Sequence, residues 1–178
     1  MKKDIINFWF NELTVSDWFK KSDKLDKLIA DRFGNYHHQA IKGELHSWRT
    51  DIEGRLAEII ILDQFSRNLF RDDPRSFQYD AMALTLAQEA IELAELENLE
   101  TRKKTFLFMP FMHSESLKIH ETAVELFSEP GLENNLNAEL KHKTIIERFG
   151  RYPHRNKILN RASTPEEEVF LKTPGSSF

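Results

Sequence analysis

The sequence predicts an all-α protein in which consecutive helices pack as an antiparallel array within a single domain spanning residues 1–178. Helix-capping residues recur ahead of apolar stretches along the chain. No alternating run of Val, Ile and Thr indicates a β-strand. Only six glycines and six prolines interrupt 178 residues. Consecutive helices with short connections usually pack as antiparallel neighbours. A tetratricopeptide-like stack is compatible with this pattern, although no clean period of about 34 residues is visible.

The expected helices follow from their start and stop signals. Thr50 and Glu53 form a T-x-x-E capping box, and Asp73-Pro74 is typical of an N-cap and a first turn. Pro110 should end one helix, and Ser114 should cap the next. The predicted ranges are 4–12, 23–48 with a break near Gly34 or Gly43, 51–71, 73–96, 100–108, 114–128 and 133–149.

The C-terminal part contains three further signals. Gly150 follows the helix predicted at 133–149 and is expected as its left-handed C-cap residue. Thr164-Pro165-Glu166-Glu167 forms a second capping box, with proline in the first helical position. The closing residues TPGSSF are expected to form a disordered tail, although its last residue, Phe178, could dock onto the fold.

Composition excludes several classes of protein. The chain is 40% apolar and 30% charged, which is globular composition, and its net charge of −4 does not favour nucleic acid or an anionic membrane as a partner. It contains no cysteine, so disulfides and thiolate metal sites are excluded. The N-terminus is a poor signal peptide, and no stretch approaches the roughly 18 apolar residues of a membrane span. We therefore expect a cytoplasmic protein.

The segment RLAEIIILDQFSRNLFR is apolar around nearly the whole helix circumference, yet it contains charged residues. Such a helix is usually buried on several sides. Asp63 and Arg67 lie on one face, beside Gln64 and Asn68. A buried charge must be paired, so an i,i+4 ion pair between Asp63 and Arg67 is one interpretation. The other is that this face lines a polar cavity.

Three histidines fall on the apolar faces of two neighbouring helices. His120 and His142 lie within the apolar stripes of helices 114–128 and 133–149, and His113 projects on the same side. Imidazole can serve as acid, base or metal ligand, whereas a single inward histidine is usually a satisfied core residue. His113 and His120 are two turns apart and no H-E-x-x-H motif occurs, so we predict no metal site.

Residues 142–161 form a basic segment, with six Lys/Arg against one acid. A planar guanidinium suits carboxylate or phosphate. The alternatives are a solvated face, or pairing with acids such as Asp63 or Glu115; RNA binding would need a motif that is absent. The residues gathered around the Gly150/Pro153 turn are Arg148, Arg151, His154, Arg155 and Asn156.

The motifs LDQFSRNLFR, FMPFMHSES and ERFGRYPHRNKILNRASTPEE, with the opening FWF and the closing PGSSF, resemble those of a bacterial domain-of-unknown-function family. The resemblance spans essentially the whole chain. It implies a tetratricopeptide-like, all-α, right-handed array of antiparallel helices, and it implies no activity. Four positions depart from the expected pattern: Ser66 replaces proline, Met112 glutamate, Tyr152 phenylalanine and Asn160 glycine.

The leading functional hypothesis is a site for a small anionic ligand on the concave side of the array. A catalytic role for the same site is part of this hypothesis. Asp63 and Glu115 would act as base or acid, and His113 as proton carrier. The ligand would be held by Arg67, Arg148, Arg151 and Arg155 and oriented by Gln64, Asn68 and Asn156, and His154 is a further candidate ligand-binding residue. No cofactor fingerprint occurs. The alternatives are a scaffold that binds a peptide or protein in an open groove, and charges that only neutralise one another.

Overall fold

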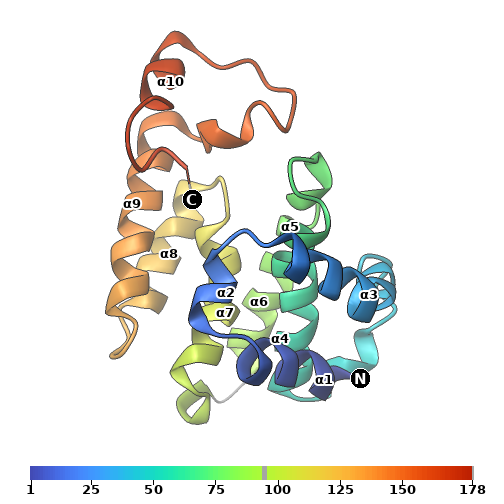
Figure 1. The fold of residues 1–178 in the computed structure, drawn as a ribbon. Coiled ribbons are helices and arrows are strands. Elements are labelled where there is room, and N and C mark those ends of the chain that lie inside the picture. Colours follow the sequence, from blue (N-terminus) through green and yellow to red (C-terminus); the bar gives the residue numbers. More distant parts are fainter. Residues whose placement is uncertain (94–95, 178) are drawn as a thin grey trace. The chain divides into compact units, whose positions relative to one another are not determined.

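A computed structural model describes residues 1–93 and 96–177, and every regular element among them is helical. This confirms the all-α prediction. The chain divides into two compact units (Figure 1). The first unit comprises residues 1–71 and 75–110, and the second comprises residues 72–74 and the chain from 111 onward. Phe178, for which docking was considered, lies outside the described residues.

The first unit contains most of the helices. In chain order they are α1 (Lys2–Asn7), the π-helical turn η1 (Phe8–Glu12), α2 (Val15–Phe19), α3 (Asp23–Ala40), the 3-10 turn η2 (His46–Thr50), α4 (Ile52–Ile60), the π-helical turn η3 (Ile61–Phe65), α5 (Ser66–Leu69), the 3-10 turn η4 (Pro74–Ser76), α6 (Asp80–Leu93), the 3-10 turn η5 (Leu96–Asn98) and α7 (Thr101–Met112), whose last two residues count with the second unit.

Aromatic rings fill the core of the first unit. The ring of Trp9 lies 5.6 Å from that of Phe65 and 5.4 Å from that of Phe106, both edge-on, and Phe33 stacks on Phe65 at 5.4 Å. Trp9, Phe65 and Phe106 are at most 2% exposed. Edge-on and offset-stacked pairs of this kind add to the stabilisation from burial. Helix α4 packs against both α1 and α6.

The second unit contains α8 (Leu117–Phe127), α9 (Glu133–Phe149), the 3-10 turn η6 (Pro153–Arg155) and α10 (Pro165–Phe170). A short turn joins α8 and α9, which lie side by side as an antiparallel pair (Figure 1). Ile145, Ile146 and Tyr152 form a hydrophobic cluster, against which Phe149 and Phe170 pack. The turn after α9 therefore carries a core residue as well as polar ones.

Several predicted helix ends are confirmed. Helix α9 ends at Phe149, and Gly150 adopts the left-handed conformation (φ 68°). Thr164 caps α10, because its hydroxyl accepts from the Glu167 N–H at 3.2 Å and the Glu167 carboxylate accepts from the Thr164 N–H at 2.7 Å. The break expected near Gly34 or Gly43 falls at the second position, since α3 passes through Gly34 and Gly43 has a positive φ of 71°.

Three predicted helix starts are wrong. Asp51, not Thr50, caps α4, because its carboxylate accepts from the Gly54 N–H at 2.8 Å. The helix expected from Pro74 begins at Asp80, and Pro74 belongs to a 3-10 turn. Helix α8 begins after Ser116, so Ser114 is not its cap.

The helix expected to stop before Pro110 continues to Met112. A proline inside a helix removes one backbone hydrogen bond and crowds the preceding turn. Here the side chains on both sides of Pro110 are buried, and burial of a large apolar side chain contributes about 1.5–3 kcal/mol. Those buried neighbours are Phe106, Leu107, Phe108, Met109, Phe111 and Met112.

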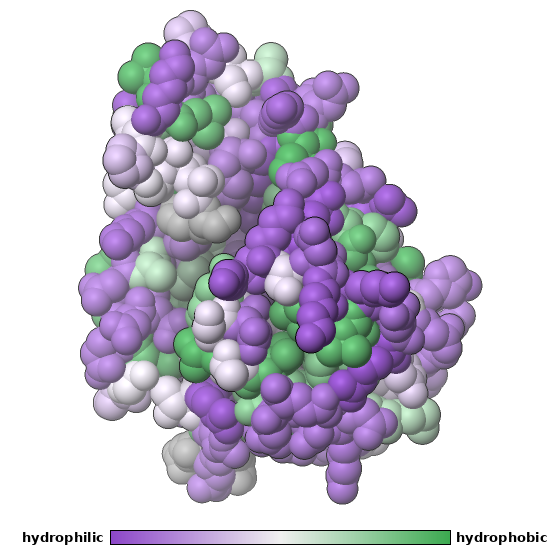
Figure 2. Space-filling view, in the orientation of Figure 1, coloured by the Kyte–Doolittle hydropathy of each residue, from purple (hydrophilic) through white to green (hydrophobic). Residues whose placement is uncertain are grey.

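Hydrophilic residues predominate on the face drawn in Figure 2, with hydrophobic residues interspersed among them. The buried polar side chains are therefore exceptions, and the candidate sites below are built from them. Among the described residues, no helix combines the length and apolar composition that a membrane span requires.

We predict that Asp51→Ala lowers the free energy of unfolding by about 0.5–2 kcal/mol, the usual loss for a removed N-cap. Thr50→Ala should cost less, because Thr50 does not cap α4. Chemical denaturation of the two adjacent variants measures the difference. An equal or larger loss for Thr50→Ala would contradict the assignment of Asp51 as the cap.

Candidate functional site

In the first unit, the predicted pair of Asp63 and Arg67 is present. The guanidinium of Arg67 lies 3.2 Å from the Asp63 carboxylate, donates to the Asp63 carbonyl at 2.6 Å, and forms two hydrogen bonds of 3.0 Å to Asp80. Gln64 donates to the Asp63 carboxylate and to the sulfur of Met109. Asp63 is 1% exposed, so these contacts replace water around its charge.

A π-helical turn positions this pair. The helix predicted over 51–71 is regular in α4, widens over Ile61–Phe65 and returns to α-helix in α5. The carbonyls of Leu62 and Asp63 accept hydrogen bonds from the side chains of Ser66 and Arg67, at 2.6 Å in each case. Single π-helical turns inside α-helices frequently occur at functional sites.

Asn68 and Arg71 bind a different carboxylate of the first unit. The amide of Asn68 donates to Asp26 of α3 at 2.8 Å, and the guanidinium of Arg71 donates to both oxygens of the same carboxylate. Asn68 therefore extends the polar network of this helix towards α3.

A buried serine and histidine also meet in the first unit, but not as a nucleophile and its base. Nε2 of His37 lies 2.9 Å from the hydroxyl of Ser66. That hydroxyl donates its proton to the Leu62 carbonyl, so it accepts from His37. A catalytic serine must instead donate to the histidine.

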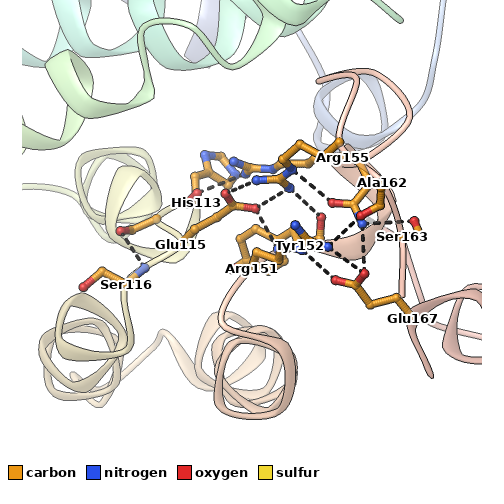
Figure 3. Close-up of polar contacts among 12 residues, drawn as sticks. His113, Glu115, Ser116, Arg151, Tyr152, Arg155, Ala162, Ser163 and Glu167 are labelled. Atoms are coloured by element: carbon orange, nitrogen blue, oxygen red, sulfur yellow. Dashed lines mark hydrogen bonds and ion pairs between the residues drawn. The ribbon is translucent and has the colours of Figure 1, made fainter. Parts of the chain in front are cut away.

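In the second unit, Tyr152 joins the turn after α9 to the segment before α8. Its N–H donates to the Glu115 carboxylate at 2.7 Å, and its hydroxyl donates to the Met112 carbonyl at 2.6 Å. Arg161 donates to both oxygens of Glu115, at 2.6 and 2.9 Å, and to the Tyr152 carbonyl at 3.1 Å. Figure 3 shows Tyr152 and Glu115 at the centre of this network.

A second carboxylate, that of Glu167, organises the other side of the turn. Arg151 donates to its two oxygens at 2.7 and 2.8 Å, and Asn156 donates to it at 3.3 Å. Glu167 is 2% exposed although Arg151 is partly exposed. Arg148 binds Glu166 at 2.8 Å in an exposed pair. The capping box of α10 therefore supplies carboxylates to two of the predicted ligand-binding arginines.

Arg155 and the histidines lie next to this network. The guanidinium of Arg155 stacks over the Tyr152 ring at 4.7 Å and donates to the His113 carbonyl at 3.0 Å (Figure 3). The His154 ring lies 5.5 Å from the Tyr152 ring. Arg155 is 6% exposed, which is unusual for a charged side chain.

These surroundings shift the pKa values in both directions. Burial, and then the charge of Arg155, lower the pKa of His154 to about 4, so this imidazole is neutral at pH 7. Burial opposes ionisation of Glu115, but the hydrogen bonds from Arg161 and the Tyr152 N–H prevail and lower its pKa. The hydrogen bonds from Arg151 lower the pKa of Glu167 to about 2. Perturbed groups of this kind gather at functional sites and also in structural ion networks.

The structure thus places the predicted residues in two groups. Asp63, Gln64, Arg67 and Asn68 belong to the first unit, and the others to the second: His113, Glu115, Arg148, Arg151, His154, Arg155 and Asn156. Asn156 accepts from Arg161 at 3.0 Å and donates to Ser163 at 3.1 Å. Among the described residues, no group of three or more His, Asp or Glu has a geometry that could hold a metal ion.

Sequence reasoning missed the partners of the predicted arginines. Asp80 binds Arg67, Glu166 binds Arg148 and Glu167 binds Arg151. None of these three acids was predicted as a partner. Glu166 and Glu167 were visible as part of the capping box of α10, but their second role depends on where α10 packs. Arg161 and Tyr152 lay inside the basic segment without being singled out as site residues.

Comparison with known proteins identifies the family of this chain. The profile of DUF924, a family of bacterial proteins of unknown function, matches residues 5–175. The chain belongs to this family. A solved structure of a protein of unknown function from Agrobacterium tumefaciens is 36% identical, with a TM-score of 0.91 over 96% of each chain. No match is found among curated proteins.

We predict that Asp63→Ala lowers the free energy of unfolding by about 1–3 kcal/mol, because Arg67 and the buried amide of Gln64 each lose an acceptor while Arg67 keeps its pair with Asp80. Asp31→Ala is the matched control, since Asp31 is an exposed aspartate on α3. Chemical denaturation of both variants is the measurement. Similar losses in the two variants would mean that the Asp63 carboxylate is not held by its neighbours.

Stability should also fall in mild acid. Burial lowers the pKa of His37 to about 4, of His142 to about 3 and of His154 to about 4. Each neutral histidine stabilises the fold fully above its unfolded pKa of about 6.5, and this contribution is lost as pH falls towards the folded pKa. Denaturation midpoints measured from pH 7 to pH 4.5 should decrease. In His142→Gln, which cannot take up a proton, the decrease should be smaller, and an unchanged decrease would contradict the buried neutral state of His142.

Proposed function

We propose that this DUF924 protein binds a small anionic molecule through a cluster in its second unit formed by His113, His154, Arg155 and Arg161, here called the basic cluster. The observation that supports it most is the convergence of charge on His154. Burial is the largest cause of the lowered pKa of this half-buried imidazole; the charges of Arg155, His113 and Arg161 lower it further, and the charge of Glu115 opposes them. A positive field at a partly solvated position attracts anions.

Two features favour carboxylate or phosphate as the group that binds. Guanidinium forks form paired, charge-assisted hydrogen bonds with these planar or tetrahedral anions. The ring of His154 is neutral at pH 7, so it adds no charge that would have to be desolvated. The ligand would thus be recognised by both charge and hydrogen-bond direction.

The cluster is also held in place before any ligand arrives. Tyr152 supports Arg155 from one side by stacking, and Glu115 holds the fork of Arg161. Side chains that are already ordered lose little rotamer freedom on binding, and this favours affinity.

Not all predicted ligand-binding residues contribute equally to this proposal. A ligand that bound Arg148 or Arg151 would have to compete with the carboxylates of Glu166 and Glu167, and Glu115 likewise occupies one edge of Arg161, so Arg155 is the main ligand-binding residue of the cluster. Participation of the first-unit residues Asp63, Gln64, Arg67 and Asn68 stays a prediction. The same holds for acid–base roles of Asp63, His113 and Glu115, and the lowered pKa of Glu115 does not suit a general acid near pH 7.

The test is a thermal-shift titration with phosphate, sulfate and a dicarboxylate, each against chloride at the same ionic strength. Binding should raise the melting temperature with concentration, following RT ln(1 + [L]/Kd). Arg155→Lys keeps the charge but removes the fork, and should weaken the response. Arg148→Ala removes a positive charge from the same basic segment outside the cluster, and should leave the response intact.

A flat response of the wild type to all three anions would contradict the proposal. So would an equal response in Arg155→Lys and the wild type. If chloride raises the melting temperature as much as the other anions do, the effect is general screening of charge and not binding at a site.

A further inference from the structure

His120 and Glu139 form a fully buried pair between α8 and α9. Both side chains are 0% exposed, and Nδ1 of His120 lies 2.6 Å from Oε1 of Glu139. On the other side of the ring, Nε2 lies 2.9 Å from the Ser114 carbonyl and 3.2 Å from the Tyr152 hydroxyl. The pair was not among the predicted site residues, although His120 was expected to point inward.

The hydrogen-bond partners determine how many protons the pair must hold. A carbonyl oxygen only accepts, and the Tyr152 hydroxyl gives its proton to the Met112 carbonyl at 2.6 Å. Nε2 of His120 must therefore carry a hydrogen that it donates to Ser114. A neutral imidazole has one N–H only, so Nδ1 would then present a lone pair.

A lone pair on Nδ1 cannot face an ionised carboxylate at hydrogen-bond distance, because both atoms would be acceptors. One additional proton must lie between Nδ1 and Oε1, on either atom. The opposite tautomer fails as well, since it would turn the lone pair of Nε2 towards the Ser114 carbonyl. The second oxygen of Glu139 is buried and has no hydrogen-bond partner among the described residues, so a fully ionised carboxylate would be costly here.

We propose that His120 and Glu139 together retain one proton in the folded protein well above neutral pH, as a net-neutral buried pair that fixes Tyr152 and the Ser114–Glu115 segment. This goes beyond the proposed anion binding and does not depend on it. It makes the packing of α8 against α9, and of the turn that carries Tyr152, sensitive to alkaline pH.

Neighbouring ionisable groups do not remove the need for the additional proton between His120 and Glu139. Lys143 lies on α9 and its charge acts on Glu139, but Lys143 also binds Glu147 on the exposed side of the helix. His142 is neutral over this pH range, since burial lowers its pKa to about 3. Burial raises the pKa of Glu139, in agreement with a retained proton.

The test compares the wild type with Glu139→Gln, whose amide can donate to Nδ1 without an ionisable proton. Above about pH 5, the unfolded states of both proteins bind the same number of protons, because an unfolded glutamate is ionised. Any pH dependence of the difference therefore reports the folded pair. The unfolding equilibrium constant of the wild type should rise relative to that of Glu139→Gln by about tenfold per pH unit from pH 5 to pH 8.

Glu125→Gln is the matched control, because it removes an exposed carboxylate from α8, the partner helix of the pair. Its unfolding constant relative to the wild type should not depend on pH over this range. A flat ratio for Glu139→Gln would overturn the proposal, since it would mean that the folded pair holds no additional proton.

If Glu139→Gln does not fold, nuclear magnetic resonance of the wild type at pH 7.5 decides the matter. The side-chain carbon of Glu139 and the Nδ1 nitrogen of His120 report where the proton lies. A protonated carboxyl or a protonated Nδ1 supports the pair, and a carboxylate facing an unprotonated Nδ1 overturns it.

Discussion

A charged side chain removed from water inside a helical array is stable only when other groups replace both its hydrogen bonds and its counter-charge. This constraint accounts for much of the polar structure of the chain. Glu58, at 0% exposure, accepts hydrogen bonds from two nitrogens of the Arg49 guanidinium. Glu167 is held by Arg151 and by the N–H of Thr164, which caps α10. In the first unit Arg67 joins Asp63 to Asp80. Helix packing and ion pairing therefore depend on one another.

The same constraint separates what the sequence could predict from what it could not. The all-helical class, the end of α9 at Gly150, the Thr164 capping box and the i,i+4 pair of Asp63 and Arg67 are local in sequence, and the structure confirms them. Helix α7 continues through Pro110 because burial outweighs a local penalty. The pairing of Arg67 with Asp80 and of Arg161 with Glu115 joins segments 13 and 46 residues apart, and it depends on packing that no local pattern reveals.

These non-local pairs change the interpretation of the basic segment. From the sequence, its arginines were interpreted either as holding an anionic ligand or as pairing with acids such as Asp63 or Glu115. In the structure, Arg148, Arg151 and Arg161 bind Glu166, Glu167 and Glu115. A ligand is favoured instead by the positive field around His154 and by the ordered guanidinium groups of Arg155 and Arg161 beside it. Membership of DUF924 and likeness to a structure of unknown function add no chemistry to this argument, so biochemical measurement must supply it.

The dependence of packing on ion pairing is tested most directly by a double-mutant cycle on Arg49 and Glu58, away from the proposed anion-binding cluster. Arg49→Met leaves the fully buried Glu58 carboxylate unpaired and should lower the free energy of unfolding by about 3–5 kcal/mol, whereas Glu58→Met leaves a partly exposed Arg49 and should cost less. The double variant should be more stable than Arg49→Met, because no carboxylate then remains buried alone. Losses that simply add in the double variant would contradict the account.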